Sequence, residues 1–270
     1  MALALLTTLP FVLLNLVALA VSWRLEHHPL PAEATCQTAA RRPGDLRRRL
    51  PLVAVNLLLV SGGTFVGTWL LSPHLSTGWP GWGAWVGQFL LLLVVDDLVF
   101  YGVHRLLHEH RGLYRLLHAR HHEAYAPLPV EILYTHPAET SLVSLGIVAG
   151  AALVHLVFGG LAFGAFLSYV IFRHLHELDV HSGMRSRLAH AIPLLAPNEH
   201  HDHHHHRPHE GNYASMLTLW DRVFGTHVED RRRPRQAPRG GLGVPVSPLP
   251  VVPAPLAARA QRLVQPAGAR

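Results

Sequence analysis

Histidine is frequent in this sequence, with 23 copies among 270 residues, and many of the copies are spaced for metal binding. The string HRLLH places His104 and His108 four residues apart, so on a helix both rings lie on one face. The string HARHH places His118 three and four residues before His121 and His122. Imidazole is the commonest metal ligand, and its neutral form carries no charge into a region of low dielectric constant. We therefore predict that these histidines bind metal.

A third group of histidines, HHDHHHH at residues 200–206, allows two registers. Its ligands are either His201, His204 and His205 or His200, His203 and His204. Further histidines lie between the groups, among them His136 in YTHPAE and His181 in HELDVH. A zinc site needs three or four protein ligands, whereas the chain supplies about eight to ten well-spaced histidines. This surplus indicates two metal ions.

Other classes of metal site are disfavoured by what the sequence lacks. Cys36 is the only cysteine, which excludes a disulfide framework and a cysteine-ligated iron–sulfur cluster within this chain. The sequence has neither the HExxH string of zinc proteases nor the ExxH pairs of soluble di-iron bundles. Nitrogen-ligated iron at a bilayer surface suits the activation of O2 for attack on a C–H bond of a lipid.

The composition indicates a membrane protein, since 49% of the residues are hydrophobic and only 15% are charged. Apolar stretches of membrane length must therefore position these histidines. Residues 3–22, 51–72 and 84–103 each reach the roughly 20 residues that cross a hydrocarbon core of about 30 Å. Residues 140–172 hold two short spans or a helical hairpin, with Gly159–Gly160 as its turn. The first run lacks the basic segment of a secretory signal peptide, so we interpret it as a membrane helix.

The sequence thus predicts an all-α integral membrane protein with about four to five transmembrane or membrane-embedded helices. Arginines in the loop between the first two runs place this loop in the cytoplasm by the positive-inside rule. They are Arg41, Arg42, Arg47, Arg48 and Arg49. The third run then returns inward, so a histidine-rich helical cap that holds the di-metal site emerges on the cytoplasmic side. Because this rule already explains the arginines, we expect no nucleic-acid partner.

Six strings in this order resemble the fatty acid hydroxylase and sterol desaturase superfamily, and within it the C-4 methylsterol oxidase branch, over about residues 90–228. They are DDLVFYGVHRLLH, HARHHEAYAP, YTHPAET, ELDVHSG, HHDHHHH and GNYASMLTLWDRVFGTH. Six ordered motifs are far more specific than a single HxxHH. The resemblance implies a non-haem di-iron oxygenase, a lipid hydroxylase or desaturase, that uses O2 as co-substrate and electrons from an external donor.

The resemblance also implies a set of metal ligands and favours one register of the third group. The implied ligands are His104, His108, His118, His121, His122, His136, His181, His201, His204 and His205. His176 departs from the sterol oxidases, which tend to have Glu there, and is either an extra ligand or a polar residue. For Glu139, Asn212 and Asp221, which match motif positions, we expect structural or supporting roles.

Asp97 is the candidate carboxylate of the catalytic site. It precedes His104 by seven residues, two turns on the same helical face, so it can accept the second ring N–H of a ligand histidine and fix its tautomer. An ionisable residue inside an apolar span is a functional candidate by default. The alternative interpretation is a helix-end carboxylate at the membrane interface.

The predicted organisation has three parts. Residues 1–83 form N-terminal transmembrane helices with an Arg-rich loop, 84–230 a fatty acid hydroxylase-like di-iron domain, and 231–270 a disordered Pro/Arg-rich tail. Two iron ions are the expected cofactors, and a sterol-like or fatty acyl lipid from the bilayer is the expected substrate.

An electron donor must be a separate protein, because the chain has no GxGxxG fingerprint and no haem domain that we recognise. A ferredoxin-, flavoprotein- or cytochrome-type donor with an acidic surface suits the Arg-rich face. The alternative function is a histidine-rich membrane metal transporter or metal-binding protein. A transport pathway would place ionisable residues in several spans, whereas here only the third apolar run has acidic residues.

Overall fold

Four stretches of the chain form apolar helices that are long enough to cross a membrane. The structure, a computed structural model, describes residues 1–37, 39, 41–185 and 187–229. The four stretches are α1 (Ala2–His27), α2 (Asp45–Leu71), α3 (Trp82–Glu109) and the consecutive pair α6 (Pro137–Val143) and α7 (Leu145–Phe158). The predicted helical membrane fold is therefore confirmed, whereas the predicted tail at 231–270 lies outside the described residues.

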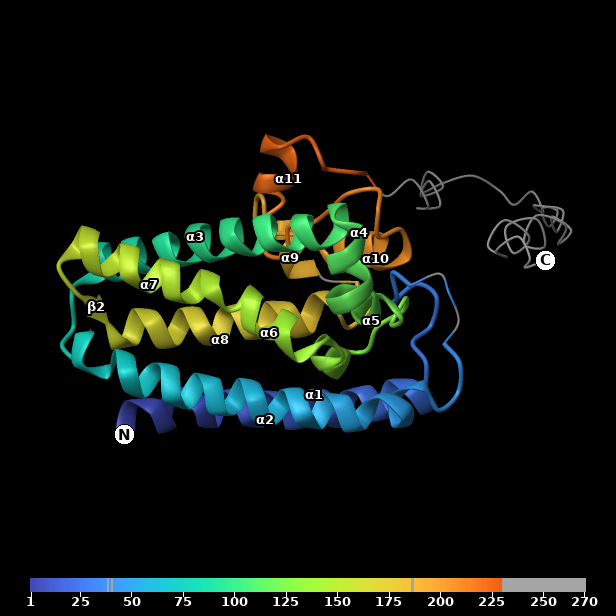
Figure 1. The fold of residues 1–270 in the computed structure, drawn as a ribbon, viewed down its shortest axis with the longest axis horizontal. Helices are drawn as coiled ribbons and strands as arrows, with labels where there is room; N and C mark the ends of the chain where they lie inside the picture. Colours follow the sequence, from blue (N-terminus) through green and yellow to red (C-terminus); the bar gives the residue numbers. More distant parts are fainter. Residues whose placement is uncertain (38, 40, 186, 230–270) are drawn as a thin grey trace, which may run out of the picture. The chain divides into compact units, whose positions relative to one another are not determined.

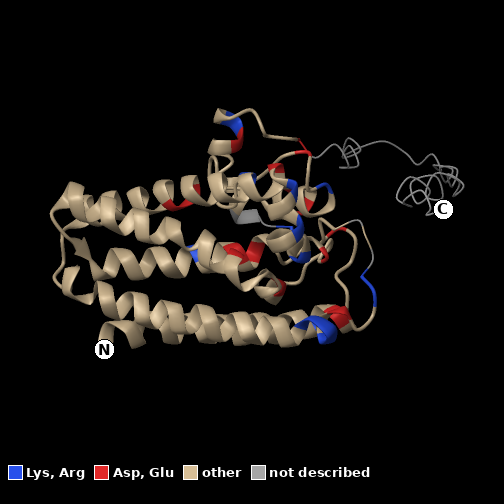
Figure 2. Cartoon of the chain, viewed as in Figure 1, with Lys and Arg blue, Asp and Glu red and all other residues tan. Residues whose placement is uncertain are grey.

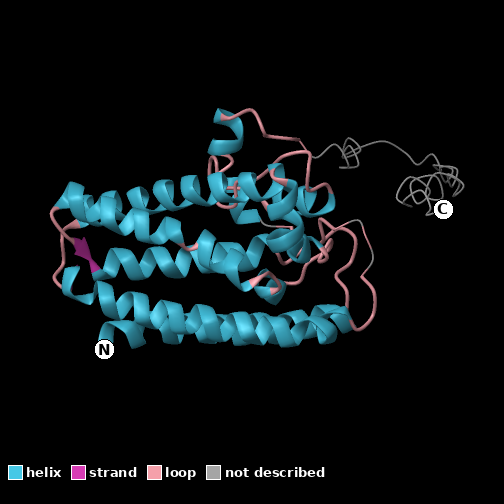
Figure 3. Cartoon of the chain, viewed as in Figure 1, coloured by secondary structure: helices cyan, strands magenta, loops and turns pink. Residues whose placement is uncertain are grey.

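The predicted hairpin is present as a turn between α7 and α8 (Phe163–Val180). Gly159 ends α7 with a φ of 71°, a left-handed conformation that glycine adopts without a Cβ clash. The chain then forms β2 (Leu161–Ala162), which pairs in parallel with β1 (Leu75–Ser76). The strand pair lies beside η1 (Ser72–His74) at one end of the bundle (Figure 3).

Small residues let α3 and α7 pack at close range. Gly146 faces α3 so closely that a Cβ there would overlap the Asp96 carboxylate. One turn later, a Cβ at Gly150 would lie 3.3 to 3.5 Å from atoms of Leu92. Such small-xxx-small spacing brings helix backbones together in membranes, where lipid leaves little hydrophobic drive between helices. Asp96 is fully buried as a result.

Helices α1 and α2 pack against each other along one side of α8 (Figure 1). Ala18 of α1, Leu46 and Val53 of α2 and Leu133 of the cap belong to one buried apolar cluster. A polar contact ties α1 to α8 as well, since Asn15 Nδ2 lies 2.8 Å from Nε2 of His174. The first apolar run is thus a packed helix of the bundle, as its interpretation as a membrane helix requires.

Short helical segments form a cap at the end of the bundle opposite β1 and β2 (Figure 1). They are α4 (Arg111–Leu113), η2 (Tyr114–His118), α5 (Ala119–His122), η3 (Pro129–Leu133), α9 (Arg187–Ala191), α10 (Asn198–His206) and α11 (Leu219–Val223). The Arg-rich loop after α1 reaches the same end, where Arg41 Nε donates to the Ala126 carbonyl at 2.6 Å. In Figure 2 many of the blue segments lie at this end, and α8 also carries blue midway along its length. The cytoplasmic location of this end stays a prediction.

Candidate metal centre

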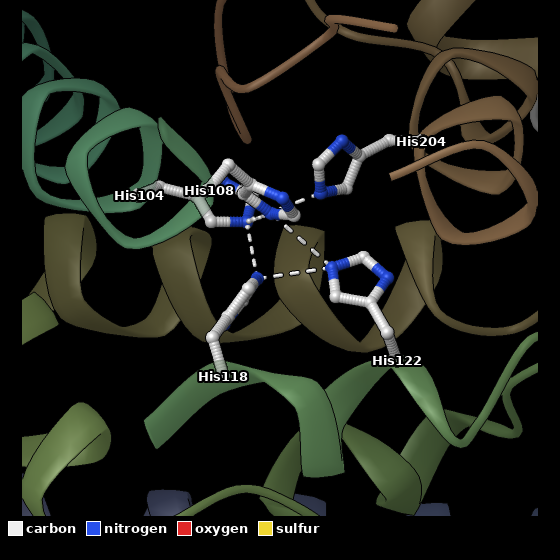
Figure 4. Close-up of side chains that lie close together, drawn as sticks. All are labelled: His104, His108, His118, His122 and His204. Carbon is white, nitrogen blue, oxygen red and sulfur yellow. Dashed lines mark hydrogen bonds between the residues drawn. The ribbon is translucent and has the colours of Figure 1, made fainter. Parts of the chain in front are cut away.

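Five histidines, from the end of α3 and from three elements of the cap, converge on one point (Figure 4). Helix α3 supplies His104 and His108, η2 supplies His118, α5 supplies His122 and α10 supplies His204. Nε2 of His104 lies 3.0 Å from that of His118 and 3.1 Å from that of His204. Nε2 of His122 lies 2.9 Å from that of His118 and 3.2 Å from that of His108. These residues form the first group.

A second group of four histidines lies beside the first and consists of His121, His181, His201 and His205. Nε2 of His201 lies 3.0 Å from that of His181 and 3.2 Å from that of His205. Nε2 of His121 completes the group, 3.4 Å from that of His181. The groups are adjacent, because the ring centroids of His122 and His205 are 4.9 Å apart.

In four of the rings, an oxygen acceptor near Nδ1 fixes the direction in which the lone pair of Nε2 points. Nδ1 of His104 lies 2.7 Å from the Tyr213 carbonyl, and Nδ1 of His204 lies 2.9 Å from the Gly211 carbonyl. Nδ1 of His118 faces Oε1 of Glu139, and Nδ1 of His181 faces the Glu177 carbonyl, each at 2.7 Å. A neutral imidazole has a single N–H. Because that N–H donates to oxygen, the Nε2 lone pair of each ring points into its group.

This arrangement fits metal ions. At a metal–nitrogen distance of about 2.1 Å, two ligands at a right angle lie roughly 3 Å apart, which is close to the separations found here. Several lone pairs that face one another at this distance repel, and a cation between them removes the repulsion. The two groups are therefore suited to hold two ions side by side.

Burial keeps the cap histidines in the form that binds metal. Burial lowers the pKa of His118 to about 3. For His201, His204 and His205, burial and the neighbouring histidines hold the pKa well below the ordinary value. Neutral imidazole is the metal-binding form, so these ligands release no proton when metal binds near neutral pH.

A break after α3 brings HRLLH and HARHH together. Helix α3 ends at Glu109, and the chain turns into α4, where Nδ1 of His110 accepts the Leu113 N–H at 3.2 Å. The next segment, η2, is a π-helical turn, an element that is frequent at functional sites. The change of direction lets His118 face His104 across the two elements rather than along one helix.

Nine of the ten predicted ligands lie in the two groups, five in the first and four in the second. The exception is His136. Its Nδ1 accepts the Ala138 N–H at 3.2 Å, so His136 caps the start of α6. His136 thus lies outside both groups, and its role as a metal ligand, which the family resemblance implied, stays a prediction.

Of the histidines at residues 200–206, those that lie in the two groups are His201, His204 and His205, which is the register that the resemblance favours. His200 points elsewhere, with its Nε2 3.0 Å from Oδ2 of Asp221. His176 also lies outside both groups, and its Nε2 is 3.1 Å from the Ser215 carbonyl.

Asp97 supports the site through the backbone. Its two carboxylate oxygens accept the N–H groups of Met216 and Leu217 at 2.9 and 3.0 Å. Among the described residues, no hydrogen bond joins Asp97 to a histidine, which differs from the expectation. The segment that Asp97 holds begins three residues after Tyr213, whose carbonyl accepts the N–H of His104.

The other motif carboxylates support histidines directly. Glu139 bonds to His118 as described above, and Asp221 accepts the Ala214 N–H at 2.9 Å besides its contact with His200. Asn212 has a φ of 59° and donates to the His200 carbonyl at 3.2 Å. The carbonyls of Gly211 and Tyr213 were not predicted, because every residue has a carbonyl and residue type carries no signal for it.

Two cavities that share part of their lining lie beside the metal-binding groups. A chamber of about 100 Å³ is lined by histidines of both groups, among them His104 and His181. A larger, mainly apolar cavity of about 860 Å³ lies between α1, α2, α7 and α8. Both cavities are lined by Phe11, Val60, Thr140, Ser144, Arg173 and His174. These six residues lie where the two cavities adjoin, and we call this region the neck.

Comparison with known proteins identifies similar sequences. The family model described as fatty acid hydroxylase matches residues 89–226. Methylsterol monooxygenase 1 of Rattus norvegicus is 35% identical over 179 residues, which cover 65% of this chain and 58% of that protein. Methylsterol monooxygenase 2-2 of Arabidopsis thaliana is 30% identical over 159 residues, 57% of either chain.

A relative with a different name also matches. Very-long-chain aldehyde decarbonylase GL1-10 of Oryza sativa subsp. japonica is 30% identical over 188 residues, 67% of this chain and 59% of that protein. The chain therefore spans somewhat more than half the length of the curated relatives that it matches. No solved structure matches it significantly.

Proposed function

The chain belongs to the fatty acid hydroxylase family, and we propose that it is a membrane-bound non-haem di-iron oxygenase that uses O2 to oxidise a C–H bond of a lipid. The observation that carries the proposal is that two adjacent histidine groups line a chamber which shares lining residues with a large apolar cavity. Bound iron would supply the binding and reduction of O2.

The protein's own residues hold the ions and shape the site. The first ion is held by His104, His108, His118, His122 and His204, and the second by His121, His181, His201 and His205. Glu139 and the carbonyls of Tyr213, Gly211 and Glu177 orient the rings. The cavity takes the apolar body of the lipid and excludes water from the chamber, and its volume lies within the range of about 300–1,000 Å³ typical of ligand pockets.

A lipid of sterol-like or acyl type suits this cavity. The names of the relatives point to both kinds, since two act on methylsterols and one on very-long-chain aldehydes. Hydroxylation balances as R–H + O2 + 2 e⁻ + 2 H⁺ → R–OH + H2O. Desaturation consumes the same O2, electrons and protons and releases two waters.

The two electrons come from a separate donor, of ferredoxin, flavoprotein or cytochrome type, on the cytoplasmic side. Exposed arginines of the cap, Arg111, Arg115 and Arg120, offer a positive surface for an acidic donor. Tyr114 lies among them, and its ring centroid is 5.4 Å from that of His108. This surface is therefore close to the first group, whose histidines would hold one of the two ions.

The test is metal content followed by isotope incorporation. The protein is purified in detergent without an affinity step that could load metal, and element analysis is set against protein concentration. We expect about two irons per chain and, with a chemical or protein reductant and ¹⁸O2, label in a lipid product or in released water. One zinc per chain, or variable loading with whichever divalent metal is supplied, would instead favour a hydrolase or the alternative function in metal transport.

A further inference from the structure

Arg173 lies in the neck between the two cavities and is the only arginine that lines either of them within the described residues. Its Nε donates to Oδ2 of Asp96 at 2.5 Å. The Asp96 side chain is fully buried and also accepts the hydroxyl of Tyr169. The charge of Arg173 is thus balanced by a carboxylate in the packed bundle. An arginine inside an apolar region is a functional candidate by default.

The guanidinium has unused hydrogen-bonding capacity on the cavity side. It carries five N–H donors, and among the described residues only the Nε–H has a hydrogen-bond partner, Asp96. The Arg173 side chain remains 15% exposed, although its partner Asp96 is 0% exposed. Arg173 lines both cavities, and its terminal amino groups have no hydrogen-bond partner among the described residues.

The charges around Arg173 decide which oxygen it suits. Asp96 already neutralises the guanidinium, and a second carboxylate, Glu177, also lines the chamber. An anionic headgroup would lose its hydration and meet these two carboxylates, so burying it is unfavourable. A neutral hydroxyl or carbonyl oxygen gains a hydrogen bond from a charged donor without adding charge.

We propose that Arg173 anchors a neutral hydroxyl or carbonyl oxygen of the lipid in the neck and so determines which end of the lipid faces the metal-binding groups. The inference deepens the proposed function and rests on it. The chamber of about 100 Å³ admits only a small part of a lipid, whereas the cavity of about 860 Å³ admits its apolar remainder. The oxidised carbon is therefore close to the oxygen-bearing end, and Arg173 is a positioning residue rather than a ligand of the metal.

The first test is binding selectivity of the purified holoenzyme, measured by native mass spectrometry without O2 or reductant. Two probe series are used: hexadecan-1-ol, hexadecane and hexadecanoic acid, and cholestan-3-ol with cholestane. We expect one series to bind and its alcohol to be favoured over its hydrocarbon by about tenfold or more, as for a hydrogen bond to a charged group. Equal binding of alcohol and hydrocarbon, or binding of neither series, would overturn the proposal.

The second test uses variants that keep the buried charge balanced. In Arg173→Met with Asp96→Asn, we expect the preference for the alcohol to fall to within about twofold while the hydrocarbon still binds. Asp96→Asn alone leaves the guanidinium unbalanced, so hexadecanoic acid should gain affinity relative to the alcohol. The matched control, Arg105→Met with Glu109→Gln, removes an i,i+4 pair on the surface of α3 and should keep the wild-type selectivity.

The outcomes separate this proposal from the proposed function. Unchanged selectivity in the double variant, with its iron content and thermal midpoint intact, would remove Arg173 from the lipid site and leave the oxygenase proposal standing. Selective binding of the alcohol by a protein that holds no iron and oxidises no lipid would support the role of Arg173 in lipid binding and would overturn the oxygenase proposal.

Discussion

Nδ1 of His118 lies 2.7 Å from Oε1 of Glu139, and both side chains are buried. The carboxylate fixes the ring so that Nε2 faces the other four histidines of the first group. It also increases the electron density on that nitrogen, as an acceptor behind a metal-binding histidine generally does.

Replacing Glu139 by Gln should therefore weaken metal binding while the fold is kept. The amide oxygen can still accept the His118 N–H, but the negative charge is lost, and we expect metal affinity to fall about 10- to 100-fold. A competition titration with a chelator measures the affinity. Glu109→Gln, which changes an exposed carboxylate on α3, is the control and should bind metal like the wild type. Wild-type affinity in Glu139→Gln would mean that the contact does not tune the site.

The register of the third histidine box is tested by two neighbouring residues. His204→Ala removes a member of the first group, and we expect a loss of metal affinity greater than about 100-fold and no turnover. His203→Ala removes a histidine that lies outside both groups, 3.3 Å from Glu210, and should change metal content by less than about twofold. Element analysis of both variants measures the effect. Equal loss in the two would show that the register is wrong.

Asp97→Asn should mainly affect stability. Asp97 accepts two backbone N–H groups, whereas an amide has one acceptor oxygen, so one buried N–H loses its partner. We expect the free energy of unfolding to fall by about 1–3 kcal/mol, seen as a lower thermal midpoint in detergent. Metal loss should follow only as the segment after Tyr213 loosens. If the variant loses metal while its thermal midpoint is unchanged, the result would support the original expectation that Asp97 acts directly on a ligand histidine.

The metal-free protein should lose stability in mild acid. Burial holds the folded pKa of His118 at about 3 and those of His201, His204 and His205 well below the ordinary value. The unfolded chain takes up protons near pH 6.5 while the folded chain does not, so this stabilisation is complete above pH 6.5 and is lost as the pH falls towards 3.

We expect a loss of about 1 kcal/mol per histidine for each pH unit in this window. Thermal unfolding after chelation, compared at pH 7.5 and 5.5, measures it. His28→Gln changes an exposed histidine and should leave the slope unchanged. A midpoint that does not move between the two pH values would argue against buried neutral histidines.

Gly146→Ala should disturb the packing of α3 on α7. The new Cβ would overlap the Asp96 carboxylate and crowd its backbone, so the helices must separate. Overpacking of this kind costs about 1–3 kcal/mol. Gly102→Ala adds the same methyl group to α3 where nothing lies within 4 Å, and it should leave the thermal midpoint nearly unchanged. Similar midpoints for both variants would mean that close approach at Gly146 is not needed.

The sequence predicts the membrane helices well because their signal is local. A run of apolar residues has to be buried in lipid or protein, and its length sets whether it spans. The turn at Gly159 is also predictable from the sequence, because a left-handed residue after a helix is usually glycine.

The histidine groups were predictable only in part. Spacing identified the residues that lie together, but it did not assign His121 and His122 to different groups, because that assignment depends on how α5 packs against α10. The family resemblance also included His136, which lies outside both groups and caps α6. The contact of Arg173 with Asp96 joins residues 77 positions apart and has no local pattern in the sequence.

Consecutive histidines are divided between the two groups, so the positions of the two groups depend on each other. His121 and His122 are consecutive but serve different groups, and so are His204 and His205. A shift of α5 or α10 along its axis would therefore displace members of both groups at once. A substitution that moves either helix should therefore change both groups together, so the two groups form one structural unit.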